Sequence, residues 1–294
     1  MIKKNSIQIY PSKNFKIAID QLSRKVFGSK FRNGETIQDT IVESRKKKII
    51  SNVTLINGTG KDIQLTEFDR AVFDVCLSAM IQNDDFISPR TIFHQLGGGH
   101  VLTVKMRKAI LDSIERLACV RVRIDMYDAI KKNIVKPVDN DTTFTGYLLP
   151  TETLETTING QRVTAIHFLS KGILYFIADM KNQITTCPQD LLNPPVRATT
   201  RTISIRHFLL RRILEIKGSH DYAVKNKRVY ALRNIITFQD LYEKCGIPLD
   251  DKSAKHDARD IATVILNFFV EHNIIKKFYF QKDGKKIHSI SLIF

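Results

Sequence analysis

Long apolar runs are absent from this chain of 294 residues. None approaches the roughly 20 residues that a membrane-spanning helix needs, so we expect no membrane partner. The first six residues are basic, but no apolar segment follows them, and this pattern does not predict a secretory signal. We therefore expect a cytoplasmic protein.

Closely spaced cysteines are also absent. The four cysteines are separated by 43, 68 and 58 residues, and no C-x-x-C pair occurs. This spacing supports neither a zinc site nor a disulfide framework, so we expect reduced thiols and no cofactor or metal. The cysteines are Cys76, Cys119, Cys187 and Cys245.

No arrangement of residues predicts catalysis. The segment Gly58-Thr59-Gly60-Lys61-Asp62 lacks the frame of a phosphate-binding loop. The eight histidines are scattered without a His-x-His pair, so a metal-dependent nickase is not indicated. Asp84-Asp85 and Asp250-Asp251 adjoin predicted turns, where loop carboxylates are common. We expect no catalytic residues and no enzyme activity.

Basic residues, by contrast, are in excess, and the excess lies at the two ends. The net charge is +16. Residues 1–65 carry 13 Lys and Arg against 5 Asp and Glu, residues 66–196 carry 14 against 15, and residues 197–294 carry 19 against 10. A surplus placed in this way favours a surface that binds a polyanion, although RNA-binding and membrane-surface proteins share it.

Two dipeptides predict β-hairpins. Asn159-Gly160 lies between two alternating runs, and Asp283-Gly284 lies between two more. Both dipeptides suit the left-handed positions of a type I′ turn, whose twist matches antiparallel strands.

Each hairpin follows a similar order of helices. Thr66, Ser88 and Thr103 are positioned as N-caps of a long, a short and a long helix, and strands follow from Val120. A helix from near Thr202 to Gly218 opens a second series, in which Thr237 and Ser253 cap the next two helices.

The predicted fold class is α+β, with tandem winged-helix domains and a basic N-terminal leader. We expect the leader at residues 1–65, a first winged-helix domain at 66–182, a linker at 183–200 and a second winged-helix domain at 201–294. Pro188, Pro194 and Pro195 mark the linker, because proline interrupts both helices and central strands.

The helix-turn-helix of this fold places its second helix in the major groove of DNA. In the second domain this is the helix that Ser253 caps, and it carries three candidate contacts. Its arginine can read guanine through the bidentate guanidinium group, and its lysine or histidine can contact guanine or phosphate. Lysines surround the hairpin, where they suit phosphate contact and equally suit an exposed edge kept soluble by charge. The candidates are Lys255, His256, Arg259, Lys276, Lys277, Lys282, Lys285 and Lys286.

Arg206, Arg211 and Arg212 form the densest basic segment of a predicted helix. They suit positioning contacts to the DNA backbone, and a solvated helix face is the equal alternative. In the near-neutral first domain, Lys105 and Lys108 are the candidates for DNA contact. Its neutrality favours protein–protein contact, and we expect the first domain to form a homodimer.

Three stretches, Phe93–Gly99, Arg107–Ile114 and Leu209–Lys217, carry a family resemblance. Over residues 65–294 the chain resembles the two-winged-helix replication initiator proteins of bacterial plasmids and conjugative elements. The resemblance implies binding to direct repeats in double-stranded DNA at an origin, origin melting and recruitment of a host initiator and helicase. It also implies that the C-terminal domain reads the repeats and that the N-terminal domain dimerises. It assigns no role to the leader.

Two other functions fit the same observations. A winged-helix transcription regulator would bind one inverted repeat and would not need to melt DNA. An RNA-binding factor would suit the charge, although the aromatic motif of ribonucleoprotein domains is missing.

Overall fold

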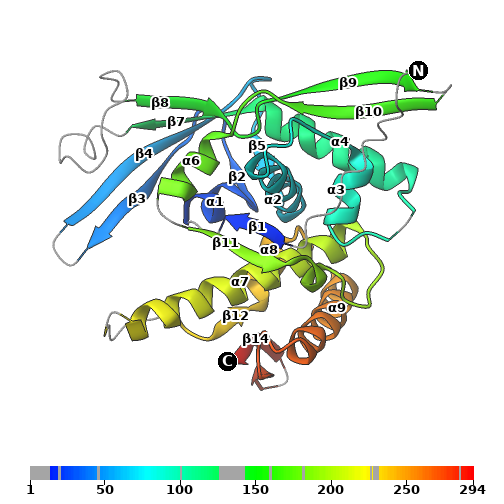
Figure 1. The fold of residues 1–294 in the computed structure, drawn as a ribbon. Helices are drawn as coiled ribbons and strands as arrows, with labels where there is room; N and C mark the ends of the chain where they lie inside the picture. Colours follow the sequence, from blue (N-terminus) through cyan, green and yellow to red (C-terminus); the bar gives the residue numbers. More distant parts are fainter. Residues whose placement is uncertain are drawn as a thin grey trace.

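The computed structural model has mixed α+β architecture (Figure 1). The residues that the structure describes are 14–18, 21–44, 47–99, 101–125, 143–158, 161–180, 183–225, 227, 232–284 and 286–294.

Two sets of elements repeat one order: a long helix, a short strand, a short helix, a further helix and a hairpin. In each set the short strand pairs with the second strand of the hairpin to form a three-stranded sheet. The first set comprises α2 (Glu67–Ile81), β6 (Phe86–Ile87), α3 (Pro89–Gln95), α4 (Val104–Cys119), β9 (Thr151–Ile158) and β10 (Gln161–Phe168). The second comprises α7 (Thr200–Lys225), β12 (Ile235–Thr237), α8 (Phe238–Lys244), α9 (Lys252–Glu271), β13 (Lys277–Asp283) and β14 (Lys286–Ile293).

Side-chain caps begin the helices largely where the sequence predicts them. Thr66 forms a capping box with Asp69, and Ser88, Thr103 and Thr237 each accept a main-chain N–H three residues later. The cap of α9 is Asp251 rather than Ser253, so this helix begins two residues earlier than expected. A carboxylate at that position is favourable because it also meets the positive end of the helix dipole.

Both predicted hairpins are confirmed as antiparallel strand pairs. Ile158 pairs with Gln161 across the first turn, whose residues Asn159 and Gly160 lie outside the described residues. Asp283 pairs with Lys286 across the second turn, in which Gly284 has a φ of 56°. That left-handed backbone is the reason a glycine suits the position.

The predicted leader is not separate from the rest of this structure. Strand β1 (Asn14–Ala18) pairs with β11 (Ile184–Pro188), which lies in the segment expected as a linker. Helix α1 (Gln21–Val26) follows, and β2 (Ser29–Phe31) pairs with β5 (Ile63–Leu65). Strand β11 ends at Pro188, and the chain then turns through a 3₁₀ helix, Gln189–Leu192.

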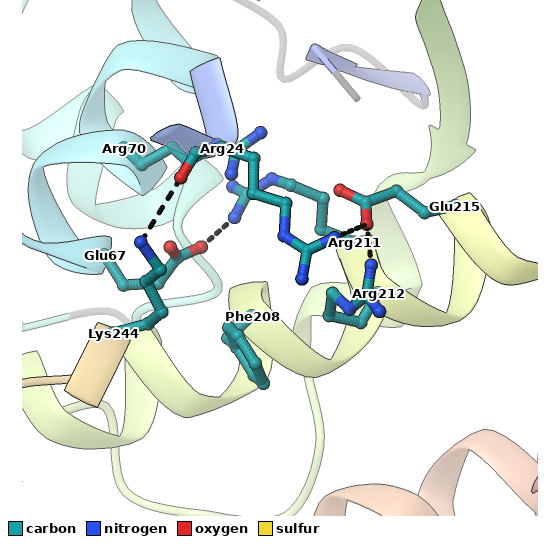
Figure 2. A pocket seen from close by; sticks show the side chains of 8 residues that line it. All are labelled: Arg24, Glu67, Arg70, Phe208, Arg211, Arg212, Glu215 and Lys244. Atoms are coloured by element: carbon teal, nitrogen blue, oxygen red, sulfur yellow. Dashed lines mark hydrogen bonds and ion pairs between the residues drawn. The ribbon is translucent and has the colours of Figure 1, made fainter. Parts of the chain in front are cut away.

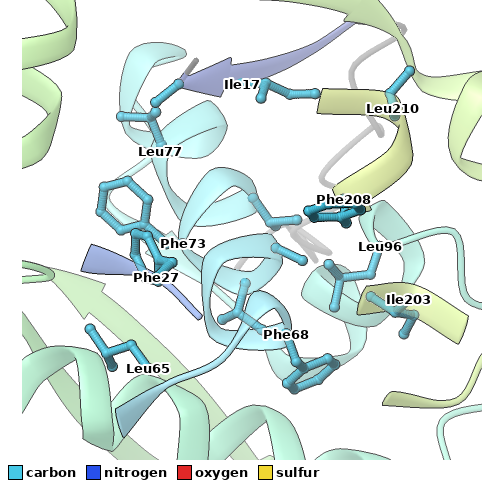
Figure 3. Packing of buried hydrophobic residues seen from close by; sticks show 14 of the residues in the cluster. Ile17, Phe27, Leu65, Phe68, Phe73, Leu77, Leu96, Ile203, Phe208 and Leu210 are labelled. Carbon is cyan, nitrogen blue, oxygen red and sulfur yellow. The ribbon is translucent and has the colours of Figure 1, made fainter. Parts of the chain in front are cut away.

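Apolar side chains explain how the described segments of the leader and linker pack. Ile17, Leu22 and Phe27 are at most 1% exposed, and Leu192 is fully buried. Figure 3 shows Ile17 and Phe27 near residues of α2, in the same core that α7 enters through Phe208. A fragment starting at residue 66 would lose these contacts, each large side chain contributing about 1.5–3 kcal/mol of burial.

A four-stranded antiparallel sheet, in the order β3-β4-β7-β8, lies against α4 and the short helix α6 (Figure 1). Its strands are β3 (Thr36–Ser44), β4 (Lys47–Asn57), β7 (Val120–Asp125) and β8 (Thr143–Tyr147), and α6 spans Ile173–Met180. The strands expected to follow from Val120 are thus confirmed. Helix α6 was not predicted from the sequence.

Helix α7 continues to Lys225, so the predicted stop at Gly218 is wrong. A side chain at Gly218 would meet nothing within 4 Å, and its backbone is not left-handed. Nothing at this position therefore requires the chain to leave the helix.

Candidate nucleic-acid interface

A hollow of about 740 Å³ opens between α8, the first turns of α9 and strand β14. Its walls follow from the local sequence, because the Thr237 and Asp251 caps start α8 and α9 side by side and the hairpin closes the third side. Phe238 and Tyr242 form its floor, being 2% and 8% exposed. The lining residues are Thr237, Phe238, Gln239, Tyr242, Leu249, Lys252, Lys255, Arg259, Ile287 and His288.

Three cations line this hollow, and no carboxylate is present among the described residues that line it. Lys255 Nζ donates to the Leu249 carbonyl at 2.7 Å, and Arg259 Nε donates to the Lys255 carbonyl at 3.3 Å. Burial raises the pKa of Tyr242, and the nearby charge of Arg259 opposes that shift. The hollow is therefore a positively charged surface suited to an anion.

The outward stripe of α9 has a different character. His256 Nδ1 lies 3.0 Å from Asp260 Oδ2, and both side chains are 67% exposed. Arg201 of α7 lies 3.9 Å from Asp257. Of the three predicted contacts on this helix, Lys255 and Arg259 are therefore brought together at the hollow, whereas His256 lies on the solvent-facing stripe beside carboxylates.

Lysines on the hairpin are exposed where the structure describes them. Lys276, Lys277 and Lys282 reach solvent, and Lys277 Nζ lies 4.8 Å from the ring centroid of Tyr279. The main chain of Lys286 pairs with Asp283, but its side chain lies outside the described part, as does all of Lys285.

The three arginines of α7 do not form a DNA-binding face. Arg206 is 0% and Arg211 is 2% exposed, and the side chain of Arg212 is 11% exposed. They are instead turned into the junction between the two sets of elements, so in this structure they do not offer the solvated helix face that contacts to the DNA backbone would need.

Oxygen atoms of the first set receive two of these guanidinium groups. Arg206 donates to the Leu96 carbonyl at the end of α3, and burial lowers its pKa to about 9. Arg211 pairs with Glu67 and, at 2.6 Å, with Asp74 of α2. Since the sequence pattern does not reveal the oxygens facing a helix, it could not separate buried from exposed arginines.

The remaining charges of this junction converge from four helices, as Figure 2 shows. Arg212 pairs with Glu215, and Arg24 of α1 lies 3.9 Å from the same carboxylate. Lys244 of α8 donates to the carbonyls of Arg24 and Phe27 at 3.3 and 3.1 Å. The space between them is about 10 Å³, enough for one water, so this is a structural network rather than a ligand pocket.

In the first set, Lys105 and Lys108 are exposed on α4 as predicted. Arg107 instead donates to Thr164 at 2.6 Å and fixes β10 against the helix. Further along α4, Asp112 and Glu115 line a hollow of about 730 Å³, in which Asp62 is a third carboxylate.

Sequence reasoning missed Lys252 and His288 at the hollow. A cap at Ser253 leaves Lys252 outside the predicted helix, and Asp251 is the signal for the earlier start. His288 lies on β14, opposite the helix, and no short-range pattern links it to Lys255 or Arg259.

Comparison with known proteins assigns no family. No family model and no curated protein matches the chain. Two crystal structures of domains 2 and 3 of RctB are similar over most of the chain, with TM-scores of 0.43 and 0.41 at 10% and 9% identity. The alignments cover 89% and 88% of this chain and 90% of each of those chains.

Within the described part of the chain, no helix combines the length and the apolar character needed to span a membrane.

Proposed function

We propose that the chain folds as two winged helices, binds specific double-stranded DNA mainly through the second of them, and acts as a replication initiator of a plasmid or other mobile element. The observation that carries this proposal is the hollow beside α9, where Lys252, Lys255 and Arg259 meet without a lining carboxylate among the described residues. The order of elements in each set, with a hairpin after the third helix, is that of a winged helix. In such a domain this helix enters the major groove.

The proposed roles of the basic side chains follow from their positions. Arg259 can reach a base edge from the helix, while the exposed lysines Lys276, Lys277 and Lys282 hold phosphates beside it. The first winged helix provides a homodimer contact, and the bound protein recruits a host initiator and helicase. The protein itself has no catalytic activity in this proposal.

Selection from random duplexes, followed by competition binding, tests the DNA proposal. Arg259→Ala should weaken the selected site by about 1–3 kcal/mol and relax preference at one base pair. Lys282→Ala should weaken all duplexes alike and reduce the slope of log affinity against log salt by about one unit. Arg233, which is exposed but outside the hollow, provides a matched control as Arg233→Ala. Equal effects of Arg259→Ala and Arg233→Ala would refute the assignment of the hollow.

The arrangement of the selected sites tests initiation. Direct repeats favour an initiator, whereas one inverted repeat favours a transcription regulator. A vector without an origin of its own should replicate once it carries this gene with its flanking sequence. Arg259→Ala should abolish that replication. Preference for structured RNA over every duplex would instead support the RNA-binding alternative.

Self-association is tested on the full chain, because residues 14–65 complete the core of the first set. Sedimentation should show a dimer whose dissociation leaves the fold intact. A monomer at all accessible concentrations would exclude the homodimer.

A further inference from the structure

The outer face of the four-stranded sheet is a second exposed surface, which the proposed duplex contacts do not involve. Strand β7 alternates between buried Val120, Val122 and Ile124 and exposed Arg121, Arg123 and Asp125. The buried residues face the core, so both arginines stand on the opposite face, away from α9 and its hollow.

Strand register defines which residues surround the two arginines. Arg121 pairs with Ile56 on β4 and with Tyr147 on β8. Because directly opposed residues project to the same side of a sheet, these three form one row across its outer face. Tyr147 is 45% exposed, and the Arg121 guanidinium carbon lies 5.4 Å from its ring centroid.

The next row is formed by residues two positions along each strand. Arg123 pairs with Thr54 and with Thr145, and Thr54 pairs with Thr36, whose hydroxyl lies 2.8 Å from that of Thr54. The third row contains a carboxylate, Asp125. Arg121 and Arg123 are both exposed on this face.

We propose that the part of this outer face formed by β7 and β8, with Tyr147, Arg121 and Arg123, binds single-stranded nucleic acid. Every base has an apolar face that an exposed ring can stack on, and arginine planes can extend the stack or pair with phosphate. In a duplex those base faces are hidden, so Tyr147 would have no stacking partner there. The site goes beyond the proposed duplex binding and lies on other elements.

Charge complementarity favours this ligand over a protein. A protein docked here would have to supply carboxylates to two arginines, since exposed charges are unfavourable at the centre of an interface unless they are paired. A single strand supplies its negative charge at every nucleotide.

Fluorescence anisotropy with labelled oligo-dT and oligo-dA tests the proposal on the full chain. Tyr147→Leu should weaken binding of both by about 5- to 100-fold, whereas Tyr147→Phe, which retains the ring, should bind like the natural protein. Arg123→Gln should weaken binding of both and reduce the salt dependence by about 0.7 units. Tyr222→Leu and Lys217→Gln, which alter an exposed ring and an exposed cation on α7, serve as matched controls.

Binding measurements with the selected duplex separate this proposal from the proposed function. Tyr147→Leu should leave affinity for the selected duplex unchanged, and Arg259→Ala should show the opposite pattern. Equal loss from Tyr147→Leu and Tyr222→Leu, or full retention of single-strand binding by Tyr147→Leu and Arg123→Gln, would overturn the assignment. So would a loss of self-association in these variants with single-strand binding unchanged, because it would identify the face as a protein interface.

Discussion

Helices α7 and α9 both carry basic side chains, and the structure places them in opposite environments. Arg206 and Arg211 of α7 are buried against the first set of elements, where carbonyl and carboxylate oxygens receive them. Lys255 and Arg259 of α9 border an open hollow. The difference arises because α7 packs against both α2 and α9, whereas one side of α9 is left uncovered. A basic helix therefore cannot be assigned to DNA until its packing partners are known.

The largest expected effect is on stability, at Arg211. Arg211→Ala should destabilise the fold by about 3–5 kcal/mol, because it removes the guanidinium that pairs with the buried carboxylates of Glu67 and Asp74. Chemical denaturation measures this change. Arg259→Ala is the control from α9 and should leave the unfolding midpoint nearly unchanged, so equal destabilisation by the two variants would remove the contrast between the helices.

Gly97 tests the same junction through the main chain. It has a φ of 73°, and an added Cβ would lie 1.7 Å from the Leu192 carbonyl oxygen. Gly97→Ala should cost about 2–5 kcal/mol, combining left-handed strain with overpacking. Gly60 provides a matched control, because its φ is 74° and nothing lies within 4 Å of its Cβ position. Gly60→Ala should cost only the backbone strain of about 1–2 kcal/mol. Equal losses of unfolding free energy in the two variants would show that the junction rearranges to accommodate the added methyl group.

The next expected effect is a pH dependence from His207 on α7. Burial, and then the charge of Arg206, lower its pKa well below the ordinary 6.5. Below pH 6.5 the unfolded chain binds a proton that the folded chain does not, so stability should fall as pH falls, by up to about 1.4 kcal/mol per pH unit. His207→Gln should reduce this slope between pH 6.5 and 5 in denaturation measurements. His256→Gln, the same change at an exposed histidine, is the control. An unchanged slope of stability against pH in His207→Gln would contradict the prediction.

Local signals in the sequence predict much of the fold. Thr66, Ser88, Thr103 and Thr237 cap the helices as expected, because capping depends on residues within one turn. Glycine at a left-handed turn position likewise predicts the second hairpin. These signals gave the order of elements in both sets.

Those local signals do not predict which distant segments of the chain pair with each other. The β1–β11 pair joins residues about 170 positions apart, so neither strand shows in its own sequence which segment it pairs with. The same limit applies to the candidate interface. Arg259 and Lys255 were predicted from one helix, whereas His288 reaches the hollow from another element.

The smallest expected effect compares the equivalent helices α4 and α9. Lys252→Ala combined with Lys255→Ala should reduce the salt slope of duplex binding by about two units, if each lysine meets one phosphate. Lys105→Ala combined with Lys108→Ala should change it by less than about half a unit, because the carboxylates of Asp112 and Glu115 on the same helix repel phosphate. Anisotropy titrations over a range of salt concentrations measure both slopes. If the two double variants lower the slope equally, both helices engage DNA alike, and the near-neutral first half is a second reader rather than a protein-binding domain.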